Sequence, residues 1–219
     1  MSRTVIIGIA VSIIILIFIG IAFFGIGYIN NSPGLYKYSV DIEGLDNYQP
    51  SLITDVIVPI PERNGQPVFS DDELQYQTFG DWKSIIVVTK VGRMLAFQSV
   101  SRNLTDIHAV FYKKYPDGTA IRNITAESVS PALPLATSPY TQRISGSAPA
   151  KDFSTIVYIP DTIRPLHGGG EPITFNLELF ADEGMQHSVQ GTVYRVRVSE
   201  RIPPGVYNST VVVAQVSEQ

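Results

Sequence analysis

The sequence predicts a mainly β protein, an antiparallel β-sandwich preceded by one N-terminal transmembrane α-helix. The first observation is an uncharged apolar run that ends at residue 29 of the 219-residue chain. The second is composition: beyond residue 29, Ile and Val number 35 while Leu and Ala number 21, and β-branched residues favour strands. The third is that apolar and polar residues alternate in several short segments, which is typical of half-buried strands.

The N-terminal segment, residues 4–29, carries no charged side chain. A helix over these residues would be about 39 Å long and would exceed the roughly 30 Å of bilayer hydrocarbon. Because Arg3 precedes the segment, the positive-inside rule predicts that residues 1–3 are cytoplasmic and that residues 30–219 are extracytoplasmic. The alternative is a signal peptide cleaved at Gly25-Ile26-Gly27, although signal peptides have shorter apolar segments of about 7–15 residues.

After a short linker at residues 30–35, the chain has the patterns of a β domain. Residues 36–43 alternate apolar and polar side chains, and residues 192–198 place Arg195 and Arg197 on the face opposite three apolar residues. Hairpins are predicted with turns at 90–93 and 115–118, since Gly and Pro-Asp-Gly suit tight turns. The predicted strands are residues 36–43, 52–58, 82–89, 94–100, 107–114, 119–125, 153–159, 173–180, 192–199 and 207–216.

Helical signals are scarce beyond the N-terminal segment. The predicted helical start is Ser70–Gln77, where Ser70 is the N-cap and Glu73, three residues on, completes a capping box. Strands therefore supply most of the predicted structure.

The proline-rich segment 126–151 bears on domain organisation. Its four prolines lie among Ser, Ala and Thr, and long loops of this kind are uncommon inside compact domains. We predict one β-sandwich over residues 36–219 with this segment as a surface excursion. The alternative is two sandwiches, 36–125 and 152–219, of which the second has four strands and would be marginally stable alone.

The segment Ile202–Tyr207, of sequence Ile-Pro-Pro-Gly-Val-Tyr, precedes the apolar residues Val211–Val213. It resembles the entry to a late strand in Ig-like extracytoplasmic sandwiches. The resemblance implies an Ig-like fold, with a jelly-roll-like arrangement as the alternative, and implies that Tyr207 is a structural corner residue. The anchor, the sandwich, the sequons described next and the absence of cysteine together resemble membrane-anchored surface proteins of archaea.

Four Asn-x-Ser/Thr sequons begin at Asn30, Asn103, Asn123 and Asn208. Chance predicts about one, because the chain has eight Asn and 33 Ser or Thr among 219 residues. Sequons mark exposed loops in exported proteins. These four asparagines are therefore the candidate glycosylation sites, and they agree with an extracytoplasmic domain.

Catalytic and metal motifs are incomplete in this sequence. His167-Gly168-Gly169-Gly170 matches an oxyanion loop of lipases, but the chain has no Gly-x-Ser-x-Gly nucleophile elbow, so a turn is predicted there. His108, His167 and His187 lack the spacing of zinc ligands. We therefore predict no catalytic residue, no metal site and no cofactor.

Acidic residues cluster at Asp41, Glu43 and Asp46 and again at Asp71–Glu73, without the pattern of a calcium loop. We interpret them as solvated loops and, for the second cluster, as helix N-terminal charges. The single tryptophan, Trp82, is predicted to lie in the core, with stacking on a sugar as the alternative.

These observations predict a non-enzymatic single-pass membrane protein that displays a β-sandwich for interaction at the cell surface. Residues 4–29 contact the lipid bilayer, and loops 126–151 and 161–172 are the expected contact regions for an unknown protein or envelope partner. A net charge of −4 argues against nucleic acid as a partner.

Two alternatives stay open. One is a structural subunit of a membrane complex or surface filament, in which homo-oligomers form through helices or sheet edges. The other is an extracytoplasmic hydrolase whose site is assembled from residues distant in the sequence.

Overall fold

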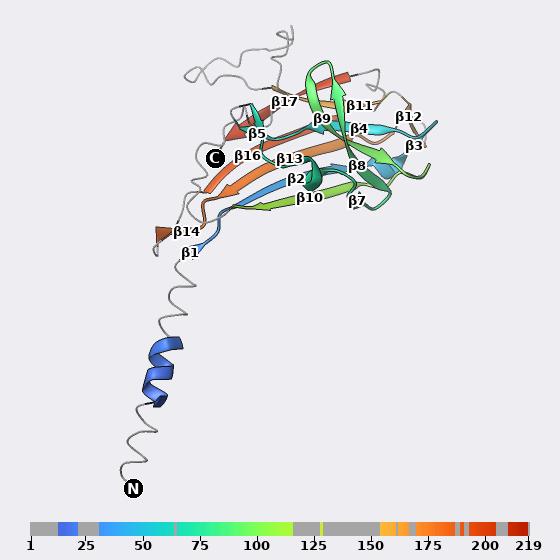
Figure 1. The fold of residues 1–219 in the computed structure, drawn as a ribbon. Coiled ribbons are helices and arrows are strands. Elements are labelled where there is room, and N and C mark those ends of the chain that lie inside the picture. Colours follow the sequence, from blue (N-terminus) through green and yellow to red (C-terminus); the bar gives the residue numbers. More distant parts are fainter. Residues whose placement is uncertain are drawn as a thin grey trace, which may run out of the picture.

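The structure is a computed structural model, and it describes residues 13–21, 31–63, 65–115, 128, 154–160, 162–166, 170–186, 189–190, 193–204 and 210–218. Within the predicted N-terminal span, residues 13–21 form a helix, drawn in blue in Figure 1. No helix among the described residues is both long and apolar enough to cross a membrane. The transmembrane span at residues 4–29 therefore stays a prediction.

The fold is mainly β, as predicted, and the strand pairs among the described residues are antiparallel (Figure 1). One layer holds four long strands that neighbour one another in the order β10, β2, β13 and β16. Their side chains alternate between a core face and an outer face, because successive residues of a strand point to opposite sides. On β2 the outward residue Ser39 is itself buried, with 7% exposure. The bounds are β10 (Ile107–Lys114), β2 (Leu35–Glu43), β13 (Ile173–Asp182) and β16 (Val193–Ile202).

A second layer follows in the order β11, β4, β9, β8 and β7. Strand β17 (Thr210–Glu218) joins the layers, since residues 210–215 pair with β11 and residues 216–218 pair with β16. The ten strands therefore form one continuous hydrogen-bonded sheet that folds over on itself. The bounds are β11 (Ser154–Ile159), β4 (Asp55–Pro59), β9 (Gly92–Ser99), β8 (Trp82–Thr89) and β7 (Thr78–Phe79).

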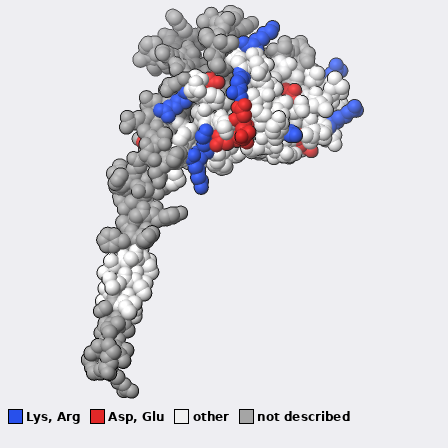
Figure 2. Space-filling view, viewed as in Figure 1, with Lys and Arg blue, Asp and Glu red and all other residues white. Residues whose placement is uncertain are grey.

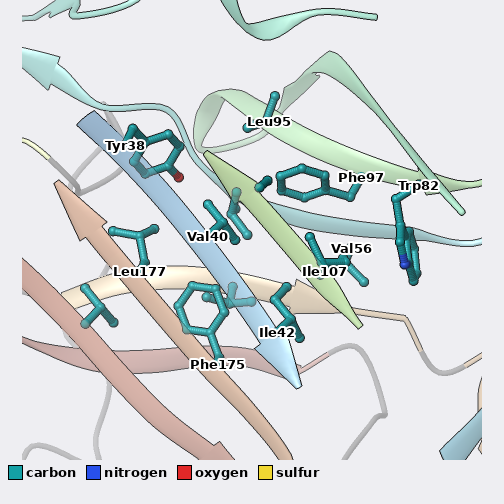
Figure 3. Close-up of a cluster of buried hydrophobic side chains, with 14 of the residues drawn as sticks. Tyr38, Val40, Ile42, Val56, Trp82, Leu95, Phe97, Ile107, Phe175 and Leu177 are labelled. Carbon is teal, nitrogen blue, oxygen red and sulfur yellow. The ribbon is translucent and has the colours of Figure 1, made fainter. Parts of the chain in front are cut away.

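The core lies between these layers and is continuous across them. Figure 3 shows side chains of β2 and β13 facing those of β4 and β9. Tyr38, which is fully buried, donates a hydrogen bond from its hydroxyl to the carbonyl oxygen of Pro59, 2.6 Å away in the other layer. Each large apolar side chain buried here contributes about 1.5–3 kcal/mol. This two-layer packing is consistent with the predicted β-sandwich.

The two ends of the folded sheet approach each other. The rings of Phe79 in β7 and Phe111 in β10 pack edge to face with centroids 5.3 Å apart. Beside them, the short helix α2 (Asp71–Leu74) packs against β10 and β8. The fold is thereby closed by side-chain packing at the place where these two end strands are not hydrogen-bonded to each other.

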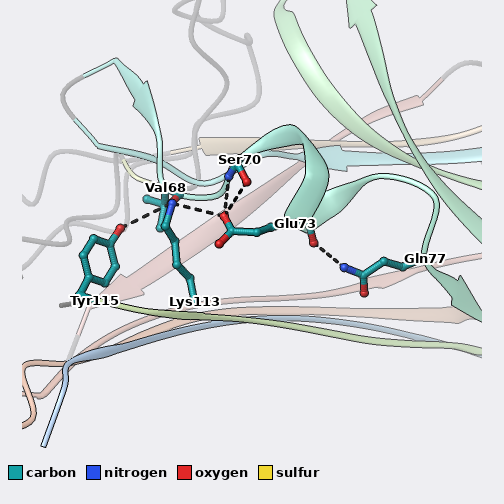
Figure 4. A network of polar contacts seen from close by, with 6 residues as sticks. All are labelled: Val68, Ser70, Glu73, Gln77, Lys113 and Tyr115. Carbon is teal, nitrogen blue, oxygen red and sulfur yellow. Dashed lines mark hydrogen bonds and ion pairs between the residues drawn. The ribbon is translucent and has the colours of Figure 1, made fainter.

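A polar network fixes α2 to β10 (Figure 4). Glu73 accepts hydrogen bonds at one carboxylate oxygen from the Ser70 backbone N–H, 2.7 Å, and from the Ser70 hydroxyl, 3.0 Å. The Lys113 ammonium lies 3.3 Å from the same oxygen and donates to the Val68 carbonyl at 2.8 Å. This confirms the predicted pairing of Ser70 with Glu73 and shows that β10 supplies its cation.

Three small sheets and a 3-10 turn complete the described structure. They are β1 (Asn31–Ser32) with β14 (Met185–Gln186) and β15 (Val189–Gln190), β3 (Tyr48–Pro50) with β12 (Ile163–Pro165), β5 (Glu62–Arg63) with β6 (Gln66–Pro67), and η1 (Leu45–Asn47).

The predicted strands that overlap the described residues match observed strands with ends that differ by at most three residues, whereas the short strands β1, β3, β5, β6, β7, β12, β14 and β15 were not predicted. The strand predicted over 52–58 is wrong at its start, because β4 begins at Asp55. The amide of Thr54 donates to the Ser99 hydroxyl at 3.0 Å, while Leu52 and Ile53 are about two-thirds exposed. The preceding residues therefore form a loop that is held at its end.

The predicted helical start at 70–77 also needs correction, since α2 ends at Leu74. Gln75 is extended and Tyr76 has a left-handed φ of 60°. The Tyr76 amide donates to the carbonyl of Ser84, 2.7 Å away. The chain thus leaves the helix to join β8.

The hairpin between β8 and β9 has a two-residue turn, Lys90–Val91, because Thr89 pairs with Gly92. Gly92 has a φ of 114°, a conformation that suits glycine, so the predicted role of this glycine is confirmed. The predicted strand 119–125 and its hairpin lie outside the described residues.

Strands from both sides of the segment 126–151 belong to the same large sheet, in which the later strands β13, β16, β17 and β11 form one block between the earlier strands β2 and β4. β13 lies between β2 and β16, and β11 lies between β17 and β4. Residues 126–151 themselves lie outside the description except for Ser128, so the predicted surface excursion stays a prediction.

Candidate functional site

The solvent face of the layer β10-β2-β13-β16 carries the most continuous set of polar side chains among the described strands. We call it the outer face. The pairing registers align its side chains in three rows that cross all four strands. The rows are His108, Asp41, Asn176 and Ser199, then Val110, Ser39, Glu178 and Arg197, then Tyr112, Lys37, Phe180 and Arg195.

The first row contains two hydrogen-bonded pairs. The His108 ring nitrogen Nδ1 lies 3.1 Å from Oδ1 of Asp41. The Ser199 hydroxyl donates to Oδ1 of Asn176 at 2.7 Å, so the amide nitrogen of Asn176 is directed to another partner. The described residues offer that nitrogen no hydrogen-bond acceptor.

The second row is organised around Glu178. Arg197 donates from Nε to Oε2 of Glu178 at 2.6 Å, and Nε of Arg195 lies 3.7 Å from the same oxygen. Arg197 therefore holds the carboxylate by a hydrogen bond, whereas Arg195, whose buried Nε has no hydrogen-bond partner among the described residues, forms a longer ion pair with it. Ser39 on β2 pairs with Glu178 on β13. The Ser39 hydroxyl has no hydrogen bond within the described part of the chain.

The third row combines aromatic and cationic side chains. The Arg195 guanidinium lies over the Phe180 ring, 5.6 Å from its centroid. Tyr112 is 60% exposed at the β10 end of the row. Lys37 forms no ion pair or hydrogen bond with any residue that the structure describes, so its ammonium is available to a ligand.

A shallow hollow of about 460 Å³ lies over the middle of the outer face. Its volume is within the range of small-molecule sites, about 300–1,000 Å³. We call it the groove, and its polar lining comes from β2, β13 and β16. These lining residues are Lys37, Ser39, Asp41, Asn176, Glu178, Arg197 and Ser199.

Of the predicted site residues, Asn103 is the one that the structure describes. It lies in an exposed loop, where the Ser101 hydroxyl donates to its carbonyl at 2.7 Å. The next residue, Leu104, is buried, and the carbonyl of Thr105 accepts a 2.8 Å hydrogen bond from the Trp82 indole. The residues that follow Asn103 thus fix the loop to the core, while Asn103 itself is exposed.

The other predicted site residues lie outside the description: Asn30, Asn123, Asn208 and the corner residue Tyr207. The same holds for His167 and His187. Trp82 is fully buried, as predicted. His108 joins the outer face, where Asp41 is its acidic partner among the described residues.

The two acidic clusters do not converge. Asp41 pairs with His108, whereas Asp46 accepts a hydrogen bond from its neighbour Asn47. Figure 2 shows the acidic side chains of the second cluster gathered around α2 with basic side chains on either side, and Arg93 forms an ion pair with Asp71. Within the described residues, no group of three or more His, Asp or Glu side chains is placed to hold a metal ion.

The polar network around α2 lowers the pKa of the Glu73 carboxyl group. Burial raises it, but the hydrogen bonds from the Ser70 amide and hydroxyl and the charge of Lys113 outweigh burial and lower the pKa overall. Glu73 therefore acts as a structural anion that holds α2 against β10.

The sequence analysis missed the outer face as a site. Alternation within the segments 36–43 and 192–199 separates a polar side from an apolar side, and that pattern was visible. This alternation does not tell which strands become neighbours or in which register they pair. No pattern of nearby residues therefore predicts the contact between Glu178 and Arg197.

Comparison of the chain with protein-family models, curated proteins and solved structures gave no match.

Proposed function

We propose that this protein is a non-enzymatic, single-pass membrane protein that displays its β-sandwich for interaction at the cell surface. We propose that the outer face makes that interaction. The observation that carries this is the groove: a hollow on a rigid sheet, lined by polar side chains that are already held by one another. Binding surfaces of this kind lose little side-chain entropy when a partner arrives.

The membrane part of the proposal rests on the uncharged segment 4–29. Its described portion supports it, because the large apolar side chains of helix residues 13–21 are about half exposed or more, as in Leu16 at 68% and Phe18 at 70%. A helix that is apolar all around is suited to a lipid environment. The N-terminus is then cytoplasmic and residues 30–219 are extracytoplasmic.

The exposed sequon at Asn103 supports the extracytoplasmic placement, since the side chain is accessible to a glycosyltransferase. The proposed fold is an Ig-like sandwich in which Tyr207 forms the corner, as its segment's resemblance implies.

The test is alkaline carbonate extraction of membranes from cells that express the full chain. We expect the protein to stay in the pellet, and external protease to cleave it in intact cells. The double variant Ile14→Lys/Leu16→Lys introduces two charges into the apolar segment, which should move the protein to the supernatant. The matched control, Leu52→Lys/Ile53→Lys, changes two exposed apolar residues of the β domain and should remain in the pellet.

Extraction of the unaltered protein by carbonate would contradict the membrane anchor. Crosslinking in the same membranes tests assembly. A ladder of defined oligomers would favour the structural-subunit hypothesis over a protein that displays its domain as a monomer.

A further inference from the structure

We infer that the groove over β2, β13 and β16 is a saccharide-binding site. The inference rests on the proposed function, because it names the ligand class for the same outer face. Its experiment is chosen so that the two can fail separately.

The groove offers both donors and acceptors that lack partners within the described residues. The donors are the Lys37 ammonium, the Asn176 amide nitrogen and the Ser39 hydroxyl. The acceptors are Oδ2 of Asp41 and Oε1 of Glu178, since the contacts of these residues with the described part of the chain involve Oδ1 of Asp41 and Oε2 of Glu178. A hydroxyl group donates and accepts at once, so a ligand with many hydroxyls can satisfy both kinds of group.

Other ligand classes fit this lining less well. A phosphate-like anion concentrates its charge at one point, where it would meet the carboxylates of Asp41 and Glu178 as well as the cations, and like charges repel. The carboxylates of an acidic saccharide are separate groups among many hydroxyls, so one of them can face Lys37 while hydroxyls face Asp41 and Glu178. An apolar ligand would cover the amide of Asn176 and leave its donors without hydrogen bonds, which costs free energy. The mixture of charges and amides thus favours a polar ligand with distributed hydroxyls.

The spacing of the side chains also suits such a ligand. Neighbouring strands lie about 4.8 Å apart, and residues two apart on one strand lie about 6.7 Å apart. Asp41, Asn176, Ser39 and Glu178 occupy the corners of one such cell, because Asp41 pairs with Asn176 and Ser39 pairs with Glu178. Donors and acceptors are therefore presented on one flat grid rather than at a single point.

The groove is organised before any ligand binds. Ser199 fixes the orientation of the Asn176 amide, and Arg197 fixes the Glu178 carboxylate. His108 holds Asp41 from the neighbouring strand. Three of the contact groups are thus held in position by residues that lie beside them, which reduces the entropy lost on binding.

The experiment is isothermal titration of the full chain in detergent micelles with two hexasaccharides, maltohexaose as a neutral probe and hexagalacturonate as an acidic probe. Inorganic phosphate and a hexaglutamate peptide are titrated in parallel. We expect at least one saccharide to bind and neither phosphate nor peptide to do so. Tighter binding of the acidic probe would indicate that a ligand carboxylate contacts the Lys37 ammonium. Tighter binding of the neutral probe would indicate that a ligand hydroxyl does so.

Variants connect any binding to the groove. Asn176→Ala and Glu178→Gln should each weaken saccharide binding about tenfold, as expected for loss of a hydrogen bond to a bound ligand. Asp72→Asn makes the same carboxylate-to-amide change as Glu178→Gln but on α2, outside the groove, and should leave affinity unchanged. Trp82 fluorescence, from the chain's single buried tryptophan, verifies that each variant is folded.

The inference is overturned if neither saccharide binds up to high millimolar concentration, if phosphate or peptide binds instead, or if both groove variants bind as well as Asp72→Asn. A protein that stays in the carbonate pellet yet binds no sugar overturns this inference alone. A protein that binds sugar but is extracted by carbonate overturns the membrane anchor alone.

Discussion

Strand β13 has two faces that behave as two regions of the molecule. Its inner residues, such as Phe175 and Leu177, are at most 2% exposed and pack into the core. Its outer residues, such as Asn176 and Glu178, are hydrogen-bonded across strands and remain open to solvent on one side. The inner side of β13 therefore contributes to the stability of the fold, and its outer side contributes to the proposed binding surface.

The two faces of β13 are stabilised by different interactions. Removal of apolar surface from water stabilises the inner face, and the loss of one side chain there leaves a cavity. On the outer face, ion pairs and hydrogen bonds compete with water and contribute little net stability. Substitutions on the outer face should therefore change binding without unfolding the protein.

The largest effect is expected on the inner face. Leu177→Ala removes a side chain packed in the continuous core and should lower the free energy of unfolding by about 2–5 kcal/mol. Urea unfolding followed by Trp82 fluorescence measures this. A loss below about 1 kcal/mol would mean that the core repacks freely and that the two faces differ less than the burial indicates.

The second prediction concerns buried tyrosines and alkaline pH. Burial raises the pKa of Tyr38 well above 10.0, and burial with nearby charges raises the pKa of Tyr115 to about 12. Because the unfolded chain releases these protons first, their contribution to stability is present below pH 10 and is lost as pH rises further.

Tyr38→Phe tests this assignment. It should lower stability at pH 7 by about 0.5–1.5 kcal/mol, through loss of the hydrogen bond to Pro59. It should also reduce the fall in stability between pH 10 and higher pH, measured by urea titrations at each pH. An unchanged alkaline slope would assign the pH dependence to groups other than Tyr38.

The third prediction addresses the brace between α2 and β10. Ser70→Ala removes a hydroxyl that contacts Glu73 and should cost about 0.5–2 kcal/mol. Since the pKa of Glu73 is lowered in the folded protein, its contribution is present above the unfolded pKa near 4.5 and is lost as pH falls through the folded pKa. Glu73→Gln should flatten the acid side of the stability profile, while Asp72→Asn should leave it unaltered.

The smallest effect is expected on the outer face. Glu178→Gln removes a partly exposed partner of Arg197 and should change the free energy of unfolding by less than about 1 kcal/mol. The same urea titration with Trp82 fluorescence measures it. A loss as large as that of Leu177→Ala would show that the outer face supports the fold and would remove the distinction between the two regions.

Much of the secondary structure was predictable, because the signals are local. The alternation in residues 36–43 predicts which side of β2 is buried, and Tyr36, Tyr38, Val40 and Ile42 are indeed buried. Glycine at position 92 and the Ser70–Glu73 spacing predict a turn and a helix start that both occur. These features depend on neighbours within a few residues, so the chain's own sequence suffices.

The start of β4 and the end of α2 were not predictable in the same way. Thr54 is held by Ser99, and Tyr76 is held by Ser84, a residue of the neighbouring strand β8. Those partners become neighbours only when the sheet forms, so apolar runs and helix propensity extend past the true boundaries.

Local patterns were enough to predict an apolar N-terminal segment, a β-rich remainder and the polar and apolar sides of several strands. Which strands become neighbours follows from the packing of the complete fold. Asp41 and Asn176 are more than 130 residues apart in the sequence. The pairing registers of β2, β13 and β16 nevertheless place them in one row with Ser199. Hydrogen-bonded pairing is satisfied by any strand of suitable pattern, so the choice of partner comes from packing of the whole core rather than from local sequence.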